Sequence, residues 1–185
     1  TKAIQRREGR KISLNVGFDP RLGKYHRTAC SRCYKQFSLD ESKRLNWRCD
    51  QCRGWIKKGV WDRVNELART QEPVHPPHRP SYLRIAPLSE VIALGLRESD
   101  AHSSTVQSVW RKLVSEFGNE ISVLVEVPIE VIKVNEKRTA EVIKAFREGS
   151  LKVVAGGGGR YGRLELPEEL ERKLSPQKTL TEFGI

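Results

Sequence analysis

The sequence contains no methionine and no long apolar run, and both absences narrow what the protein can be. A chain of 185 residues that begins at Thr1 without methionine is expected to be processed or, as we favour, cut from a longer chain. Its longest apolar stretches, such as residues 91–96, are far shorter than the roughly 18 residues that a membrane-spanning helix needs. The sequence therefore predicts a soluble intracellular protein.

The sequence also lacks the residue groups that mark most catalytic sites. No nucleophile stands beside an evident base, and no cluster of carboxylates is present. The glycine-rich run at residues 156–162 lacks the Gly-Lys-Ser/Thr ending of a P-loop, which disfavours ATP binding and a role as an ATP-using helicase accessory. We therefore expect that this chain alone is not a catalyst.

Cysteine is scarce, but the four cysteines form two matched pairs. Cys30 and Cys33 form one Cys-x-x-Cys pair, and Cys49 and Cys52 form a second pair after fifteen intervening residues. This spacing is typical of one structural zinc ion held by four thiolates in a zinc ribbon. Two disulfides are the alternative, and the absence of a secretory signal and the basic composition favour zinc.

Positive charge is concentrated in the first third of the chain. Residues 1–63 contain 17 Lys and Arg against six Asp and Glu, whereas residues 64–185 contain 17 of each kind. Such a segment is typical of a surface that binds a polyanion, and DNA is the favoured partner over a merely solvated face. The residues that we expect to contact DNA are Arg21, Lys24, Arg32, Lys35, Arg53, Lys57, Lys58, Arg160 and Tyr161. DNA binding in turn predicts a cytoplasmic, nucleoid-associated protein.

Aromatic residues are interleaved with these charges, as in surfaces that stack on nucleic-acid bases. Some of the rings must instead fill the small core of the ribbon, and the sequence does not separate the two groups. The rings are Tyr25, Tyr34, Phe37, Trp47, Trp55 and Trp61.

Changes in composition predict an α+β fold in which a small four-cysteine zinc ribbon precedes a mixed helical and β-hairpin domain. Four prolines within residues 73–80 predict an extended connector. The predicted segments are a terminal strand and turn of an upstream domain (1–23), the zinc ribbon with a helix (24–72), the connector (73–80), the α+β domain (81–167) and a flexible tail (168–185).

Hydrophobic periodicity and capping residues predict individual elements. Ser104 is expected to cap one helix and Asn135 another, and Gly118 and Gly149 end them. The predicted helices cover residues 60–69, 87–96, 105–117 and 136–148, with a short helical turn from residue 128. The predicted strands cover residues 11–16 and 121–127, and a hairpin joins residues 153–154 to 164–166.

Three further groups allow more than one interpretation. The glycines at 156–162 could approach a phosphate closely, touch DNA or a partner domain through Arg160 and Tyr161, or form a plain turn. His75 and His78 have a chelating spacing on a helix, which the prolines exclude. Residues 100–102 resemble the Asp-Ala-His ending of metal-dependent PHP phosphoesterases, but helix capping explains them better.

The C-terminal tail carries a Gln-x-x-aliphatic-x-x-aromatic pattern. Gln177, Leu180 and Phe183 would place two apolar side chains on one face of a helical turn, with the amide beside them. The pattern resembles the PIP box by which DNA-processing proteins bind the sliding clamp PCNA. Gly184 stands where a second aromatic residue is common, which puts the affinity in question.

Taken in order, several motifs together resemble the C-terminal half of endonuclease Q, a DNA-repair nuclease of archaea and some bacteria. They are the run at residues 14–26 (Leu-Asn-Val-Gly-Phe-Asp-Pro-Arg-Leu-Gly-Lys-Tyr-His), the paired Cys-x-x-Cys motifs, His-Pro-Pro-His-Arg-Pro at 75–80, and the run from residue 146 to the glycine-rich loop. The resemblance covers nearly the whole chain.

The resemblance implies an upstream PHP domain that binds the catalytic metals. It also implies cleavage on the 5′ side of deaminated bases such as uracil or hypoxanthine, and of abasic sites. This chain would then be a non-catalytic half that grips DNA and tethers the enzyme to the clamp, with Tyr161 or Trp55 as candidates for holding a flipped-base gap. The alternative is a zinc-ribbon adaptor, a transcription or replication factor without nuclease activity.

Overall fold

The computed structural model describes residues 1–70 and 72–175, and it confirms the mixed α+β class with small sheets. Contacts divide the chain into two compact units. The first unit contains Thr1–Ala86 and Val153–Arg163, and the second contains Pro87–Lys152 and, among the described residues, 164–175. Among the described residues, no helix is long and apolar enough to cross a membrane.

The zinc ribbon of the first unit is built on a short antiparallel pair, β2 (Ala29–Cys30) and β3 (Ile56–Lys57). Helix α1 (Leu39–Arg44), which the sequence did not predict, follows β2 and begins with a capping box between Ser38 and Glu41. Phe37 and Ile56 are buried in one cluster with Cys30 and Cys49, and Trp47 packs against it. Two of the six aromatic rings of the basic segment therefore belong to the ribbon core.

A parallel strand pair flanks the ribbon in sequence. Strand β1 (Leu14–Phe18) begins three residues later and ends two residues later than the predicted strand. It pairs in parallel with β4 (Ser81–Ile85), which follows the proline-rich segment. A turn of 3-10 helix, η1 (Pro20–Leu22), leads from β1 toward the ribbon, and helix α2 (Val60–Leu67) leaves it. The described residues of α2 bury none of their side chains.

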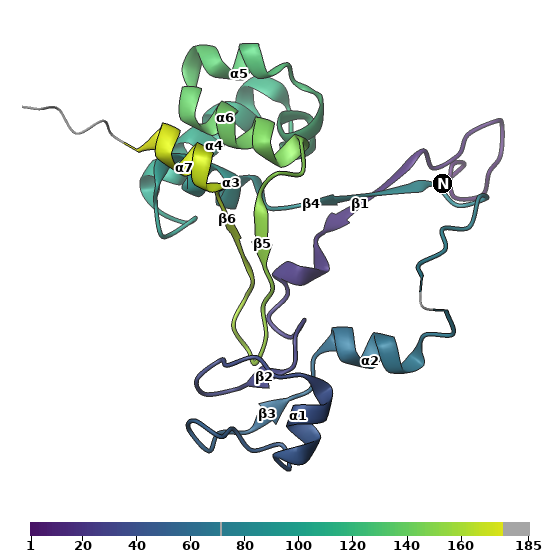
Figure 1. Cartoon of the computed structure of the whole chain (residues 1–185). Helices are drawn as coiled ribbons and strands as arrows, with labels where there is room; N and C mark the ends of the chain where they lie inside the picture. Colours follow the sequence, from purple (N-terminus) through teal and green to yellow (C-terminus); the bar gives the residue numbers. More distant parts are fainter. Residues whose placement is uncertain (71, 176–185) are drawn as a thin grey trace, which may run out of the picture. The chain divides into compact units, whose positions relative to one another are not determined.

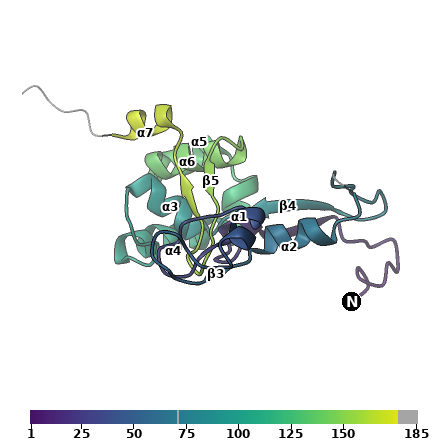
Figure 2. The same cartoon turned by 60° about the horizontal axis from the view of Figure 1, so that its bottom comes forward.

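The second unit is a cluster of helices, visible in Figure 1 and Figure 2. Helix α3 (Leu88–Leu96) packs on α4 (Ser104–Phe117) and α6 (Lys137–Arg147), and α5 (Ile129–Asn135) packs on α6. At Gly95 a Cβ would lie 3.1 Å from the backbone of Thr139, so α3 and α6 approach closely there. The core side chains include Leu88, Ile92, Leu113, Leu124, Ile132 and Ile143.

The strand predicted over residues 121–127 is wrong. These residues form a π-helical turn, η2 (Ser122–Glu126), that buries Val123 and Leu124. The β-branched run suits a strand by propensity, but the helical core takes up its apolar side chains and Arg147 satisfies its carbonyls. The Arg147 guanidinium donates to the carbonyl oxygens of Val123, Leu124 and Val127 at 2.6–3.0 Å.

Two predicted caps differ by one residue from the structure. Ser103, rather than Ser104, caps α4 by accepting a hydrogen bond from the Val106 amide at 3.4 Å. Asn135 ends α5, and Glu136 occupies the cap position of α6. Gly118 ends α4 as predicted, with a φ of 90°.

The chain crosses from the second unit to the first and back through the paired strands β5 (Lys152–Val154) and β6 (Arg163–Glu165), which carry the glycine-rich loop between them. The segment predicted as a flexible tail begins instead with helix α7 (Glu168–Leu174), which starts after Pro167 with three glutamates in its first turn. The predicted clamp residues Gln177, Leu180 and Phe183 lie outside the described residues.

Candidate metal centre and nucleic-acid interface

The four cysteines converge on one point. The sulfur atoms of Cys30, Cys33, Cys49 and Cys52 all lie within 4.8 Å of one another. The Cys30–Cys52 and Cys33–Cys49 sulfur pairs are 3.4 and 3.6 Å apart, far longer than the roughly 2.05 Å of a disulfide. They are close to the ~3.8 Å edge of a tetrahedron with Zn–S bonds of about 2.3 Å. The residues fit the predicted structural zinc ion, and the disulfide alternative does not fit.

The two Cys-x-x-Cys turns have the same backbone geometry. The Tyr34 amide donates to the Cys30 carbonyl at 3.1 Å, and the Arg53 amide donates to the Cys49 carbonyl at 3.0 Å. Both Tyr34 and Arg53 adopt positive φ angles, 62° and 60°. Each turn therefore folds back on its first cysteine and directs both thiols to one point.

The environment of the thiols is uneven. Burial by itself raises the pKa of Cys30, but the amides of Cys33 and Arg32 and the neighbouring thiols lower that pKa to about 7. The Lys35 amide lowers the pKa of Cys33, but burial and the other three thiols outweigh it and raise that pKa to about 12. Without a cation the cluster therefore resists full ionisation, and a bound metal would have to displace protons.

The glycine-rich loop lies against the ribbon, as Figure 1 shows at the end of β5 and β6. The Arg27 amide donates to the Gly156 carbonyl at 2.8 Å, and the Gln36 side-chain amide donates to the Ala155 carbonyl at 2.8 Å. Five amides of the loop donate to backbone carbonyls at 2.9–3.1 Å; the donors are Gly156, Gly157, Gly159, Arg160 and Gly162. These amides are already used, so the loop is a docked segment and not an open phosphate cradle.

Docking of this loop gathers aromatic rings and cations on one part of the first unit, which we call the loop–ribbon surface. Lys24 Nζ lies 5.5 Å from the Tyr161 ring centroid and 5.7 Å from that of Tyr25. Lys57 Nζ lies 5.5 Å from the Tyr25 centroid. The Arg160 guanidinium lies 6.0 Å from that of Tyr34. All three tyrosines are exposed, Tyr161 by 68%. The surface consists of Lys24, Tyr25, Tyr34, Lys57, Arg160 and Tyr161.

Three other predicted DNA-binding cations are ion-paired within the chain. Arg21 pairs with Asp19 at 2.7 Å, and Lys35 pairs with Asp50 at 2.7 Å. Lys58 pairs with Glu66. An ion-paired side chain has less charge to offer a phosphate, so these positions are weaker candidates than Lys24, Lys57 and Arg160.

The remaining predicted cations lie at the cysteine turns. Arg32 donates to the Cys52 carbonyl at 3.4 Å, and Arg53 occupies the left-handed position after the second turn. The structure adds Arg48, whose guanidinium lies 3.4 Å from the centroid of the exposed Trp55 ring. Sequence reasoning missed this contact. Its signal in the sequence is the position of Arg48 and Trp55 on either side of the second Cys-x-x-Cys pair, and the structure joins the two residues by an antiparallel bridge.

The other candidate metal ligands do not gather into a site. His75 Nε2 hydrogen-bonds the Arg79 carbonyl at 3.2 Å. Asp100 accepts a hydrogen bond from the His102 amide at 2.8 Å, which is the turn geometry expected of a capping segment. Within residues 1–70 and 72–175, the four cysteines are the one group of potential ligands within reach of a common ion.

Comparisons with known proteins match nearly the whole chain. Residues 87–150 match a family model described as the MJ0043 C-terminal domain. The uncharacterized protein MJ0043 of Methanocaldococcus jannaschii is 42% identical over 162 residues, which are 87% of this chain and 20% of that protein. The uncharacterized protein YqxK of Bacillus subtilis is 37% identical over 164 residues, 88% of this chain and 38% of that protein.

Two solved structures confirm the resemblance drawn from the sequence. One is the lesion-specific endonuclease PfuEndoQ from Pyrococcus furiosus, with a TM-score of 0.80 and 47% identity over 98% of this chain. The other is endonuclease Q in complex with a 27-mer duplex that has an abasic lesion at the active site, with a TM-score of 0.84 and 47% identity over 97% of this chain. This chain spans 44% of each solved chain, and thus less than half of the proteins it matches.

Proposed function

We propose that this chain, which matches endonuclease Q over almost its whole length, is the DNA-gripping part of a DNA-repair endonuclease. The enzyme would cut on the 5′ side of deaminated bases, such as uracil and hypoxanthine, and of abasic sites. The observation that carries the proposal is the loop–ribbon surface, which places three cations beside three exposed tyrosines. The abasic duplex bound to one solved relative supports it.

The chemistry of the loop–ribbon surface suits a damaged duplex. Lys24, Lys57 and Arg160 would contact backbone phosphates, and this term makes affinity dependent on salt. Exposed tyrosine rings can stack on bases that have left the duplex. Tyr161, an exposed ring of the docked loop, would fill the gap beside a flipped nucleotide, where pairing is already weak.

The catalytic metals would be bound by an upstream PHP domain of the same longer protein, and zinc in the ribbon would have a structural role. The β1–β4 pair supports a further domain. Parallel strands normally have both faces covered. Here Leu14, Val16 and Phe18 are exposed along β1, Phe18 by 60%. An upstream domain that packs on this pair would bury these side chains.

The tail would tether the enzyme to the sliding clamp. Gln177, Leu180 and Phe183 supply the PIP-box pattern ten or fewer residues after α7 ends at Leu174. Deletion of residues 177–185 should abolish co-elution with PCNA on gel filtration while DNA affinity is unchanged. Co-elution that survives the deletion would remove the tethering proposal. Such an enzyme would work on the chromosomal DNA of the cytoplasm.

Nicking of damaged DNA tests the function as a whole. The chain, joined to the residues encoded upstream in its gene, should nick uracil-containing and abasic duplexes in the presence of a divalent metal. The 185-residue chain alone should bind the same duplexes without cutting them. Binding by both proteins with no nicking by the longer one would favour the alternative function, a zinc-ribbon adaptor without nuclease activity.

A further inference from the structure

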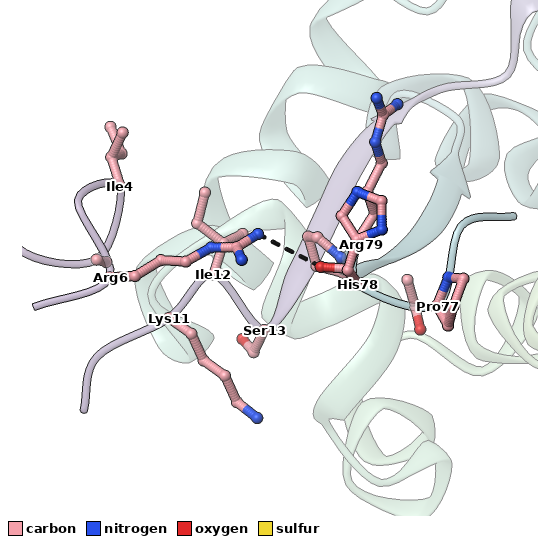
Figure 3. A pocket seen from close by; sticks show the side chains of 11 residues that line it. Ile4, Arg6, Lys11, Ile12, Ser13, Pro77, His78 and Arg79 are labelled. Atoms are coloured by element: carbon pink, nitrogen blue, oxygen red, sulfur yellow. Dashed lines mark hydrogen bonds between the residues drawn. The ribbon is translucent and has the colours of Figure 1, made fainter.

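A polar pocket lies in the first unit, and none of its lining residues belongs to the loop–ribbon surface (Figure 3). Its volume is about 600 Å³, and it forms between residues 3–13 and the segment 77–81. One wall is the end of the proline-rich segment and the other is the approach to β1. The two walls are held side by side where the strands begin, because Leu14 of β1 pairs with Ser81 of β4.

The pocket is positively charged. Arg6, Lys11 and Arg79 line it together with His78, and no carboxylate is among its lining residues. None of the three cations forms an ion pair with the described part of the chain. Arg6 Nη2 donates a 3.3 Å hydrogen bond to the His78 carbonyl, and the other donors of the Arg6 guanidinium make no hydrogen bond to the described residues. Three unpaired cations in one recess favour an anionic ligand.

The remaining lining groups narrow the class of anion. The hydroxyls of Ser13 and Ser81 add further hydrogen-bonding groups, and Ile4, Ile12 and Pro80 add apolar surface. Guanidinium and ammonium groups donate hydrogen bonds and accept none, so they suit a ligand with several acceptor oxygens. The volume lies within the 300–1,000 Å³ typical of small-molecule pockets and exceeds what a bare inorganic anion fills. A phosphate with an attached sugar matches both the donors and the apolar wall.

The segment that carries His78 and Arg79 is held in place locally. Pro77 and Pro80 restrict the backbone on either side of these residues. The His75 ring bonds the Arg79 carbonyl, and the Arg79 amide donates to the Pro76 carbonyl at 3.0 Å. The proline-rich segment thus holds the Arg79 backbone beside the pocket, where its guanidinium is one of the lining groups.

We propose that this pocket is a second DNA contact, which binds one phosphodiester of the backbone and its deoxyribose. The proposal rests on the DNA-binding function above and adds a phosphate contact outside the loop–ribbon surface. DNA held at two separate places would resist rotation about either one. Neither Arg6, Lys11 nor Arg79 was among the DNA contacts expected from the sequence.

The test compares two charge-matched double variants of the 185-residue chain on a fluorescent duplex with an abasic site. Lys11→Gln with Arg79→Gln removes two pocket cations. Arg111→Gln with Lys137→Gln removes two exposed cations on α4 and α6 that also carry no ion pair within the described residues. The pocket variant should bind about tenfold more weakly, and its slope of log affinity against log salt should be shallower by about 1, the value for one lost phosphate contact.

Several outcomes would overturn the proposal. Equal losses of DNA affinity in the two variants would show that only the total charge of the chain matters. If the pocket variant binds DNA as tightly as a wild-type chain that does bind, the pocket is not a DNA contact, and the proposed function is unaffected. A wild-type chain that fails to bind would remove both. Unchanged DNA affinity combined with weaker binding of a separately expressed upstream domain would reassign the pocket to a protein partner.

A second measurement separates DNA from free phosphate. Inorganic phosphate and the abasic duplex are each titrated into the isotope-labelled chain, and the amide resonances of Ser13, Arg79 and Ser81 are followed by NMR. The proposal predicts that the duplex shifts these resonances at micromolar concentration and that inorganic phosphate does so only weakly. Tight binding of inorganic phosphate, with no competition from the duplex, would identify a free-phosphate site and contradict the DNA assignment.

Discussion

Gly158 lies directly against the backbone of Cys30, one of the four clustered cysteines. A Cβ built on Gly158 would be 2.2 Å from the Cys30 carbonyl oxygen, and Gly158 has a φ of 67°. The glycine-rich loop and the metal centre are far apart in sequence, yet one residue joins them. The loop–ribbon surface therefore depends on both the loop glycine and the folded cysteine cluster.

Replacement of that glycine should separate DNA binding from metal binding. Gly158→Ala would force the loop away from Cys30, because the clash is with backbone that has little freedom to move. We expect DNA affinity to fall about tenfold, since Arg160 and Tyr161 would leave the surface while the four thiols stay in place. Fluorescence anisotropy with an abasic duplex and the zinc content of the purified protein measure the two effects.

Gly149→Ala is the matched control. Gly149 has a φ of 69°, and a Cβ there meets nothing within 4 Å, so this variant has the backbone strain without the clash. Strain of this kind costs about 1 kcal/mol. A Gly158 variant that binds DNA as well as the Gly149 variant would show that docking of the loop does not shape the interface.

Charge reversal at two adjacent lysines should have unequal effects. Lys57 lies near the Tyr25 ring, whereas Lys58 is paired with Glu66. Lys57→Glu should weaken DNA binding several-fold more than Lys58→Glu and flatten the salt dependence by about 1. Parallel salt titrations of both variants check this, and equal losses would mean that only the net charge of the segment matters.

Zinc affinity should rise with pH. The pKa of Cys33 is raised to about 12 and that of Cys30 is lowered to about 7. Between pH 6 and 8, binding of zinc must therefore displace the Cys33 proton and part of the Cys30 proton. The apparent affinity should increase about tenfold per pH unit for each proton displaced. Competition with a chromophoric chelator measures it, and an affinity that is flat over this range would contradict the thiol assignments.

The Asp19–Arg21 pair should contribute stability that disappears in acid. The Arg21 side chain lowers the pKa of Asp19 in the folded state below its ordinary value. A lowered acid pKa contributes stability that is complete above the unfolded pKa of about 4 and is lost as pH falls through the folded pKa. Asp19→Asn should therefore lower the unfolding temperature at pH 6, and the difference from wild type should shrink below pH 4. A difference that stays constant from pH 6 to pH 3 would contradict it.

Local patterns predicted the parts of this structure that depend on neighbouring residues. The Cys-x-x-Cys turns, the helices that begin near residues 60, 88 and 104, and the Gly118 stop are set by spacing, capping and periodicity. The β-branched residues at 121–127 misled because burial in a helical core and the contacts of Arg147 override strand propensity. Those contacts come from a distant helix and leave no local signal.

The candidate nucleic-acid interface was likewise predictable only in part. Its cations and rings were visible in the sequence, but their pairing was not. Lys35 and Lys58 form ion pairs with Asp50 and Glu66, which only the fold brings near. Arg21 pairs with Asp19, which is only two residues away in sequence. Similarly, the glycines at 156–162 allowed a phosphate cradle as one interpretation, but their amides donate to carbonyls of residues 21–24 and of the loop itself.

The most direct test of the loop–ribbon surface is photocrosslinking from its outermost ring. Benzoylphenylalanine in place of Tyr161 is irradiated with an abasic duplex, beside the same amino acid in place of Val134, which is 82% exposed in the second unit. We expect a crosslink from position 161 to nucleotides next to the lesion and little from position 134. No crosslink from position 161, or equal crosslinking from both positions, would contradict it.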